Sequence, residues 1–426
     1  MKTFLLCLLF LVFGTIISEA QTPTDAGIPD ANHVLVVYKL PESQADTISI
    51  GLANYYKNRR GIPANNIVGL YLPDTTITIN DTTHIVGLAQ ETDIIRDIDQ
   101  DAIWAATPTF HAWRYYLDYV AAPIKNWITS HNLTSTIRYI LLVKGVPFKI
   151  QARGDWSGLD GTKGNLTVDG LLCMLNTENY DSFITNEVYP NGGISNPYFN
   201  DDPNLTMDYR FVPDHFVKTW NGYNVKLSYL VSHLDGISYD IVKGMIDRSI
   251  APDMSGTAAW ILDDDPTYIG YGYLNSTRDK LEELGFNIVP DSTDSWVTSY
   301  NGDVMGYTSW GTHAEDDNCN WEDSAWVVDS LHFSWAKGAV FNAPESFNGN
   351  SLTMLQWGHW YEDQSRCGHT QGLATQFTQI GGTGTMGHAW EPGLGGVVGD
   401  SIFFPAYAMG YNLVDAIYQG KRGLAT

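Results

Sequence analysis

The sequence predicts an α/β protein built as three-layer α/β/α sandwiches with mainly parallel sheets. Short apolar, β-branched runs alternate with segments of helical period along most of the chain. Several of these runs are apolar on both faces, as strands of a parallel sheet covered by helices on both sides must be. With 426 residues, the chain also exceeds what one core usually holds, so we expect two subdomains.

The first subdomain is expected over residues 21–150. Strands are predicted at residues 33–40, 67–72 and 138–143. A helix over residues 46–60 places Ile48, Leu52 and Tyr55 on one face, and Gly61 and Pro63 end it.

A second helical pattern runs over residues 113–127, where apolar residues recur at alternating spacings of four and three. It contains Pro123, which must kink the helix or begin a new one within it.

A loop-rich junction is expected over residues 151–225, and a second subdomain over residues 226–426. The junction is rich in Gly, Asn, Asp and Pro and has one good apolar run, at residues 168–175. Strands of the second half are predicted at residues 229–234, 257–262, 286–289, 304–310, 338–343 and 383–389. Helices are predicted at residues 238–250 with Ser238 as N-cap, 276–284, 352–357, 372–380 and 412–418.

Residues 1–20 are typical of a secretory signal peptide. Lys2 precedes an apolar run, and Ser18 and Ala20 are the small residues expected before a cut at Gln21. The run is shorter than the roughly 20 residues that a membrane-spanning helix needs. We therefore expect a secreted or cell-surface protein with no membrane span.

The net charge limits the class of binding partner, and the number of cysteines limits the disulfides that can form. The net charge of −24 argues against binding of nucleic acid or anionic membranes, which both require positive potential. Loss of Cys7 with the signal peptide leaves Cys173, Cys319 and Cys367. One disulfide and one free thiol is the simplest arrangement, and Cys319 with Cys367 is the predicted pair because both lie in polar, loop-like sequence.

Polar side chains follow four predicted strands of the second half. They are Asp263, Asp264 and Asp265; His313; Glu345 and Ser346; and His388 and Glu391. Ligands of open parallel sheets bind beyond the carboxyl ends of the strands, so these groups converge if the four strands are parallel neighbours. The alternative is that they cap helices or bind water, as loop residues commonly do.

Two chemistries fit these residues. Ser346 would be a nucleophile if His313 or His388 takes its proton, with Glu345 or Asp264 orienting the base. Alternatively, the carboxylates could bind calcium, which takes six to eight oxygen ligands, or simply lie at the surface. The calcium ligands would be Asp263, Asp264, Asp265, Glu345 and Glu391.

The common catalytic signatures do not occur in the sequence. It contains no GxSxG, HExxH, P-loop or complete EF-hand motif. Residues 382–387 match GxGxxG, but these glycines lead into a predicted strand, whereas the dinucleotide motif opens a helix. Nucleotide binding is therefore not favoured.

Residues 305–311 (MGYTSWG) and 341–349 (FNAPESFNG) resemble the two active-site strands of gingipain-type cysteine peptidases. The resemblance implies a caspase-like fold for the second subdomain. By position, the catalytic histidine of that family falls on Trp310 and its nucleophilic cysteine on Ser346, so both catalytic residues are replaced. His313, three residues after Trp310, would be the substitute base.

A likeness over nearly the whole mature chain is to a family of uncharacterised secreted bacterial proteins. It is carried by residues 34–38, 55–63, 139–147, 167–169, 229–236 and 387–392. That family has no established activity to transfer. Its members continue into a further strand, which implies that this chain is a fragment or lacks a C-terminal surface-sorting domain.

Two functions therefore stand as expectations. One is an extracellular, peptidase-like hydrolase with Ser346, His313 and Glu345 as its catalytic residues. The other is a non-catalytic surface protein that binds a peptide or glycan at the same sheet edge. The predicted binding residues are Trp310, Asp264, His388, Glu391 and Asp169.

Overall fold

The computed structural model describes most of the chain beyond residue 30. The described residues are 30–88, 94–99, 110–150, 167–188, 194–200, 202, 209–253, 255–264, 274–310, 326–345, 348–349, 352, 374–389 and 396–424. The expected signal peptide, the cysteine pair and the helix at residues 352–357 lie outside this part of the chain, apart from residue 352 itself.

The first sheet is four-stranded and entirely parallel, in the order β10-β6-β1-β2. Its strands are β1 (Val34–Lys39), β2 (Ile67–Leu70), β6 (Tyr139–Val143) and β10 (Leu230–Leu234). Each coincides with a predicted strand. We expected the last of them to begin the second subdomain, but β10 pairs with β6 along its whole length. The first sheet therefore extends beyond the expected boundary at residue 226.

Helices cover both faces of this sheet, because alternate residues of each strand point to opposite sides. Val34 and Val36 face α1 (Ile48–Arg60) and α7 (Tyr239–Ile250), whereas Leu35 and Val37 face the larger core on the other side. The Ser238 side chain accepts a hydrogen bond from Ile241 N and caps α7, as predicted.

The helical segment around Pro123 is continuous. It consists of α2 (His111–Tyr115), a π-helical turn (Tyr116–Ala121) and α3 (Ala122–Ser130). Proline has no N–H and its ring conflicts with the carbonyl four residues earlier, and the wider π turn directly before it relieves that conflict. Pro123 therefore interrupts the regular α-helix without ending the segment.

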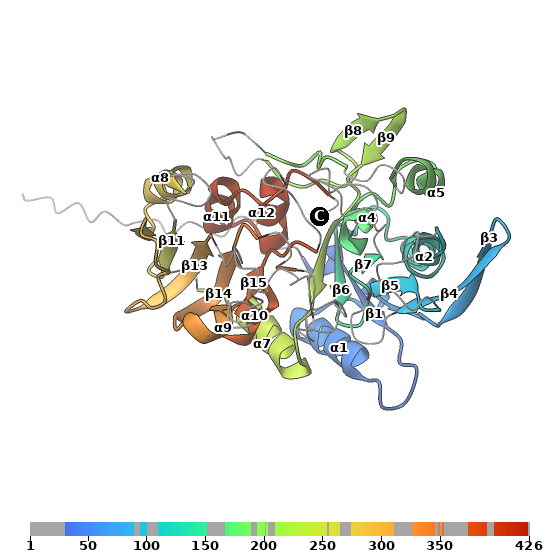
Figure 1. Ribbon diagram of the computed structural model, residues 1–426, viewed down its shortest axis with the longest axis horizontal. Coiled ribbons are helices and arrows are strands. Elements are labelled where there is room, and N and C mark those ends of the chain that lie inside the picture. The colour runs from blue at the N-terminus through green and yellow to red at the C-terminus, as the bar shows by residue number, and fades with distance from the viewer. Residues whose placement is uncertain are drawn as a thin grey trace, which may run out of the picture.

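Two smaller sheets extend the first half. The strands β3 (Thr75–Ile79), β4 (Thr82–Leu88) and β5 (Ile94–Asp97) are antiparallel, and β5 continues in parallel onto β7 (Lys149–Ile150). The hairpin of β3 and β4 projects from the body on the side away from the second sheet (Figure 1). The other small sheet is the hairpin of β8 (Val217–Trp220) and β9 (Tyr223–Lys226).

The expected loop-rich junction contains more regular structure than its composition suggests. Its apolar run forms α4 (Val168–Cys173), and α5 (Tyr180–Phe183) leads into a second π-helical turn (Ile184–Val188). Cys173 is a buried free thiol, and its Sγ lies 3.0 Å from the hydroxyl of Tyr418.

The second sheet is five-stranded and entirely parallel, in the order β12-β11-β13-β14-β15. Its strands are β11 (Ala259–Asp263), β12 (Asn287–Asp291), β13 (Asp303–Ser309), β14 (Ser334–Asn342) and β15 (Gly384–Thr385). The last strand is much shorter than the predicted run at residues 383–389. As expected, the glycines of residues 382–387 lead into a strand.

Helices also cover both faces of the second sheet. Trp260 and Leu262 pack with α8 (Asn275–Glu283), α11 (Asp400–Ala408) and α12 (Leu413–Gly420). Ile261 and Tyr307 face α9 (Trp326–Ser330) and α10 (Ala374–Gln379). Both halves are thus three-layer α/β/α arrangements with parallel main sheets.

Helix α12 lies between the two sheets, close to the C-terminal end of the chain (Figure 1). Ile417 belongs to the core of the second sheet and Tyr418 to that of the first. No helix among the described residues combines the length and the apolar character needed to span a membrane.

Candidate functional site

The strands β11, β13, β14 and β15 are parallel neighbours in the second sheet, as we expected. Their carboxyl ends therefore share one edge, and the residues that follow them gather there. Of the residues predicted for this edge, the structure describes Asp263, Asp264, Trp310, Glu345 and His388. Ser346, His313, Glu391 and Asp265 lie outside the described residues.

His388 follows β15 and is completely buried. Its Nδ1 lies 2.9 Å from the backbone carbonyl oxygen of Glu345. Since a carbonyl only accepts, Nδ1 carries the proton and Nε2 holds the free lone pair. Within the described part of the chain, Nε2 has no hydrogen-bond partner.

The environment keeps His388 neutral. Burial and, to a lesser degree, the charge of Lys421 lower its pKa from 6.5 to about 4. The backbone of Glu345, and not a carboxylate, orients the ring, whereas the sequence suggested the side chain of Glu345 or Asp264 for this role.

The loop after β14 packs closely against the segment after β15. His388 N donates to Asn348 Oδ1 at 2.8 Å, and Gly349 N donates to His388 O at 3.0 Å. A Cβ on Gly349 would lie 2.6 Å from the backbone of Gly387. The glycines at these two positions are therefore explained by close backbone approach and do not need a bound nucleotide.

Asp263 and Asp264 point to opposite faces of the sheet, as successive strand residues do. Asp263 is fully buried and accepts hydrogen bonds from Tyr307 Oη at 2.7 Å and Val297 N at 3.0 Å. Burial raises its pKa to about 6. It is a hydrogen-bonded core residue, and it does not converge with Asp264 on a common ligand.

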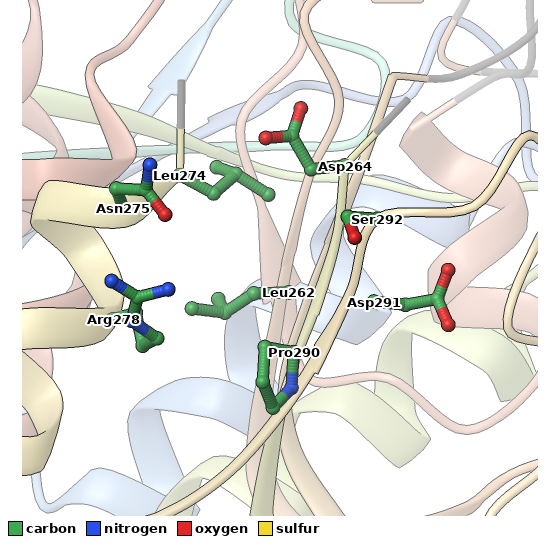
Figure 2. Close-up of a pocket in the computed structure, with 8 residues that line it drawn as sticks. All are labelled: Leu262, Asp264, Leu274, Asn275, Arg278, Pro290, Asp291 and Ser292. Carbon is green, nitrogen blue, oxygen red and sulfur yellow. The ribbon is translucent and has the colours of Figure 1, made fainter. Parts of the chain in front are cut away.

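Asp264 instead lines a recess of about 220 Å³ between α8 and the ends of β11 and β12. Figure 2 shows its carboxylate beside Leu274 and Asn275, with Arg278 on the same side of the strands. Arg278 is held by Asp279 at 2.8 Å. The recess is therefore separate from His388, which follows the opposite edge strand, β15.

Trp310 lies at the end of β13 and is partly exposed. Its ring stacks on Trp296 with centroids 6.0 Å apart, and Trp296 stacks on Trp326 at 5.2 Å. Three indole rings thus form a column whose outer member reaches the sheet edge.

The carboxyl edge of the first sheet carries a second polar group, formed by Asp169 and His233. His233 Nδ1 lies 2.7 Å from Asp169 Oδ1. Burial disfavours the charged ring, but the Asp169 carboxylate outweighs it, so the pKa of His233 is raised. Nearby, Lys144 Nζ pairs with Asp235 Oδ1 at 2.9 Å.

His233 was not predicted from the sequence. It is the penultimate residue of β10, which we expected in the second subdomain but which pairs with β6 in the first sheet. The rule that identified His388, polar residues at the carboxyl ends of parallel strands, would have identified His233 with β10 in the first sheet.

The two edges meet at a small apolar cluster of Ile94, Phe148 and Ala389. Phe148 contacts His233 edge-on, with ring centroids 6.4 Å apart, and Ala389 directly follows His388. Lys421 acts electrostatically on both Asp169 and His388. We call this region, defined by Asp169, His233, Phe148, His388 and Lys421, the junction. From here on, the word refers to this meeting of the two sheet edges and not to the loop-rich segment of residues 151–225.

Basic side chains lie at and beside the junction, although the whole chain carries a net charge of −24. Lys149 is almost completely buried, and burial lowers its pKa to about 7. The region thus contains two buried lysines, Lys149 and Lys421, together with the ion pair of His233 and Asp169.

Comparison with known proteins gives no further guide to the identity of this site: the chain matches no family model, no curated protein and no solved structure.

Proposed function

We propose that this chain is a secreted, peptidase-like hydrolase with a gingipain-like second sheet, in which Ser346 is the nucleophile and His388 the general base. The observation that carries the proposal is the unprotonated Nε2 of a buried, neutral His388. The carbonyl that fixes this tautomer belongs to Glu345, the residue directly before Ser346.

The reaction would follow the acyl-transfer scheme of serine hydrolases. The Ser346 oxygen attacks the substrate carbonyl carbon while its proton passes to His388 Nε2. The bond to the leaving amine breaks as His388 returns that proton, which leaves an ester on Ser346. Water then attacks the ester with the same proton transfers and releases the acid.

The low pKa of His388 sets the expected rate. A general base works best when its pKa lies near the working pH, and a ring with a pKa of about 4 is a weak proton acceptor. We therefore expect hydrolysis to be slow and to persist into the acidic range. Slow hydrolysis is also what we expect of a site in which the gingipain cysteine and histidine are replaced.

The first-sheet side of the junction would bind substrate. Its positive groups, His233 and Lys421, favour a peptide that carries a carboxylate close to the cleaved bond. Asp169 would then hold the His233 ring in place and would not itself react.

Digestion of a peptide library, read by mass spectrometry, tests this function. Ser346→Ala and His388→Gln should each lower cleavage at least about 100-fold, as loss of a general base or nucleophile does. The exposed His332→Ala serves as the matched control and should cleave as wild type does. Melting temperatures of all variants show whether they fold.

A fluorophosphonate label gives a second readout that does not require the right peptide. Wild type should gain one label, found on Ser346 by peptide mapping, and Ser346→Ala should gain none. Equal cleavage by Ser346→Ala, or a wild type that neither cleaves nor reacts with the label, would overturn the proposal.

The indole column favours a second candidate, a non-catalytic surface protein that binds a glycan or peptide. Aromatic faces at a sheet edge bind sugar rings and peptide side chains, and Trp310 is the partly exposed member of the column that lies at the end of β13. Trp310→Ala should then weaken retention on an oligosaccharide or peptide array, whereas Trp220→Ala, on the remote β8 hairpin, should not. Unchanged retention in Trp310→Ala would dismiss this candidate.

A further inference from the structure

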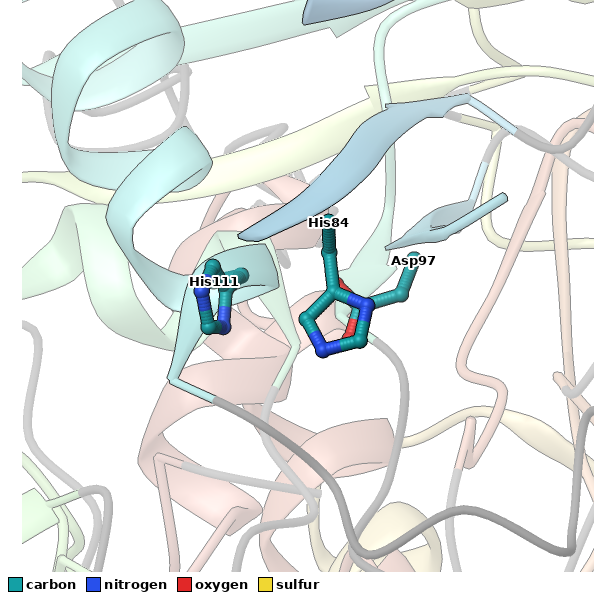
Figure 3. A group of neighbouring side chains, drawn as sticks. All are labelled: His84, Asp97 and His111. Carbon is teal, nitrogen blue, oxygen red and sulfur yellow. The ribbon is translucent and has the colours of Figure 1, made fainter. Parts of the chain in front are cut away.

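Three potential metal ligands meet far from the second sheet, next to the projecting β3–β4 hairpin. His84 comes from β4, Asp97 from β5, and His111 is the first residue of α2. One ring nitrogen of each histidine and one carboxylate oxygen all lie within 4.8 Å of one another. Figure 3 shows the three side chains directed toward a common centre.

The surroundings of His111 orient its ring as in many metal-binding histidines. Its Nε2 lies 2.9 Å from the carbonyl oxygen of Thr82, so Nε2 carries the proton and Nδ1 the lone pair. The residue is 3% exposed, and among the described residues Nδ1 has no hydrogen-bond partner. A buried acceptor without a partner lowers the stability of the fold unless a donor or a metal ion binds it.

His84 has a carboxylate as its outer neighbour. Its Nδ1 lies 3.4 Å from Asp99 Oδ1, and its ring meets that of His111 edge-on, with centroids 4.7 Å apart. Metal-bound histidines usually engage a carboxylate or a backbone carbonyl through their second nitrogen. Both histidines of the group have such a neighbour.

We propose that His84, Asp97 and His111 bind one Zn²⁺ ion. Two imidazoles and one carboxylate suit a borderline divalent transition ion, whereas calcium and magnesium prefer oxygen ligands alone. Ligand atoms that each lie about 2 Å from one tetrahedral ion are roughly 3.3 Å from one another. The three side chains must therefore move closer together by about an ångström when they bind the ion. Three protein ligands leave the fourth position to water.

Bound zinc would fasten the hairpin to the body of the protein. Without it, β4 and β5 meet α2 through side-chain packing and the hydrogen bond of His111 to Thr82 O. With it, a single ion joins both strands to the start of the helix. At its other end, β5 contributes Ile94 to the apolar cluster of the junction. The ion therefore stabilises an element that borders the proposed active site, although zinc binding does not depend on that function.

Zinc binding is measured on the whole chain after dialysis against a chelator. Competition with a chromophoric chelator should give one Zn²⁺ per chain, and Co²⁺ should give the visible absorption bands of a four-coordinate site. Asp97→Asn and His111→Ala should each weaken binding at least about 100-fold, and Asp99→Asn about 10-fold. The exposed His215→Ala is the matched control and should bind as wild type does.

Each outcome bears directly on the proposal. Failure of wild type to bind zinc or cobalt stoichiometrically, or equal binding by Asp97→Asn and wild type, would overturn it. Because Asp97→Asn preserves shape and hydrogen bonding, a loss of binding with an unchanged melting temperature of the zinc-free protein supports it. None of these readouts uses hydrolysis, so this proposal and the proposed function fail separately.

Discussion

Ionisation of Asp415, which lies on α12, should cost this fold a measurable amount of stability. It is 2% exposed. Its two oxygens accept hydrogen bonds from Tyr139 Oη at 2.6 Å and Tyr198 Oη at 3.1 Å, and Asn412 Nδ2 also donates to it. Burial nevertheless dominates and raises its pKa from 3.8 to about 6.

The sign of the pH effect follows from the two pKa values. Between pH 3.8 and about 6, the folded carboxyl holds its proton while the unfolded one releases it, so the free energy of unfolding falls as the pH rises through this window. From pH 4 to pH 7 the loss is about 2 kcal/mol for this one group. Above pH 7 it stays constant.

The perturbation is Asp415→Asn, which keeps an acceptor oxygen and removes the ionisation. Urea unfolding of wild type and variant, followed by tryptophan fluorescence from pH 4 to pH 8, gives the two free energies. The variant should gain about 2 kcal/mol relative to wild type between pH 4 and pH 7. The exposed Asp294→Asn should show no such divergence, and parallel curves for Asp415→Asn and wild type would refute the reasoning.

Two further outcomes test packing and the charge state of His388. Gly170→Ala should cost roughly 3 kcal/mol of stability in urea unfolding, because its Cβ would lie 1.8 Å from the carbonyl oxygen of Leu424, a backbone atom that cannot rotate away. Gly423→Ala, with no atom closer than 3.9 Å to the new Cβ, is the control, and equal losses would contradict the clash. His388 loses its proton more readily in the folded state, so wild type should lose about 3 kcal/mol relative to His388→Gln as the pH falls from 6.5 to 4. A difference that does not change over this range would show that His388 is not buried in its neutral form.

The strands of the two main sheets were predictable because they are buried on both faces. β1 consists of consecutive apolar residues with almost no exposed side chain, and such runs are read directly from the sequence. Helix α7 was equally clear, since Ser238 provides its cap and its apolar face repeats with the helical period.

The β3–β4–β5 sheet was missed because its strands lack that signal. β3 (TTITI) alternates between half-buried and exposed residues and has no continuous apolar run. Its pairing depends on β4 and on α2, which no local pattern reveals. α11 was missed for a different reason, since Pro405 within the helix interrupts the pattern that predicts one.

Residues of the site could be predicted only where the sequence indicated correctly which strands belong to the same sheet. The edge rule led to His388 and Glu345 because β14 and β15 are parallel neighbours, as expected. It missed His233 because the partner of β10 is β6, about 90 residues earlier in the chain. The zinc ligands have no regular spacing at all, since tertiary packing alone brings His84, Asp97 and His111 together.

The junction depends on how rigidly the two sheets are held, and buried polar contacts contribute to holding them. On one side, Tyr418 Oη donates to Val231 O at 3.0 Å and Asp415 accepts from Tyr139. On the other, Arg248 donates to the carbonyl of Gly382, just before β15, at 2.6 Å.

The two sides of an apolar interface can slide past each other and still exclude water. Buried hydrogen bonds, in contrast, are satisfied in one docking geometry only. Each buried hydrogen bond left unmade costs about 1–3 kcal/mol of stability. The carboxyl edges that carry His233 and His388 are therefore fixed relative to each other before any ligand arrives. A substitution that removes both acceptors of the Tyr139 and Tyr198 hydroxyls, such as Asp415→Ala, then becomes a test of the site as well as of the fold. If the docking geometry positions the junction, a variant of Asp415 that loosens α12 should lower cleavage without touching either ring.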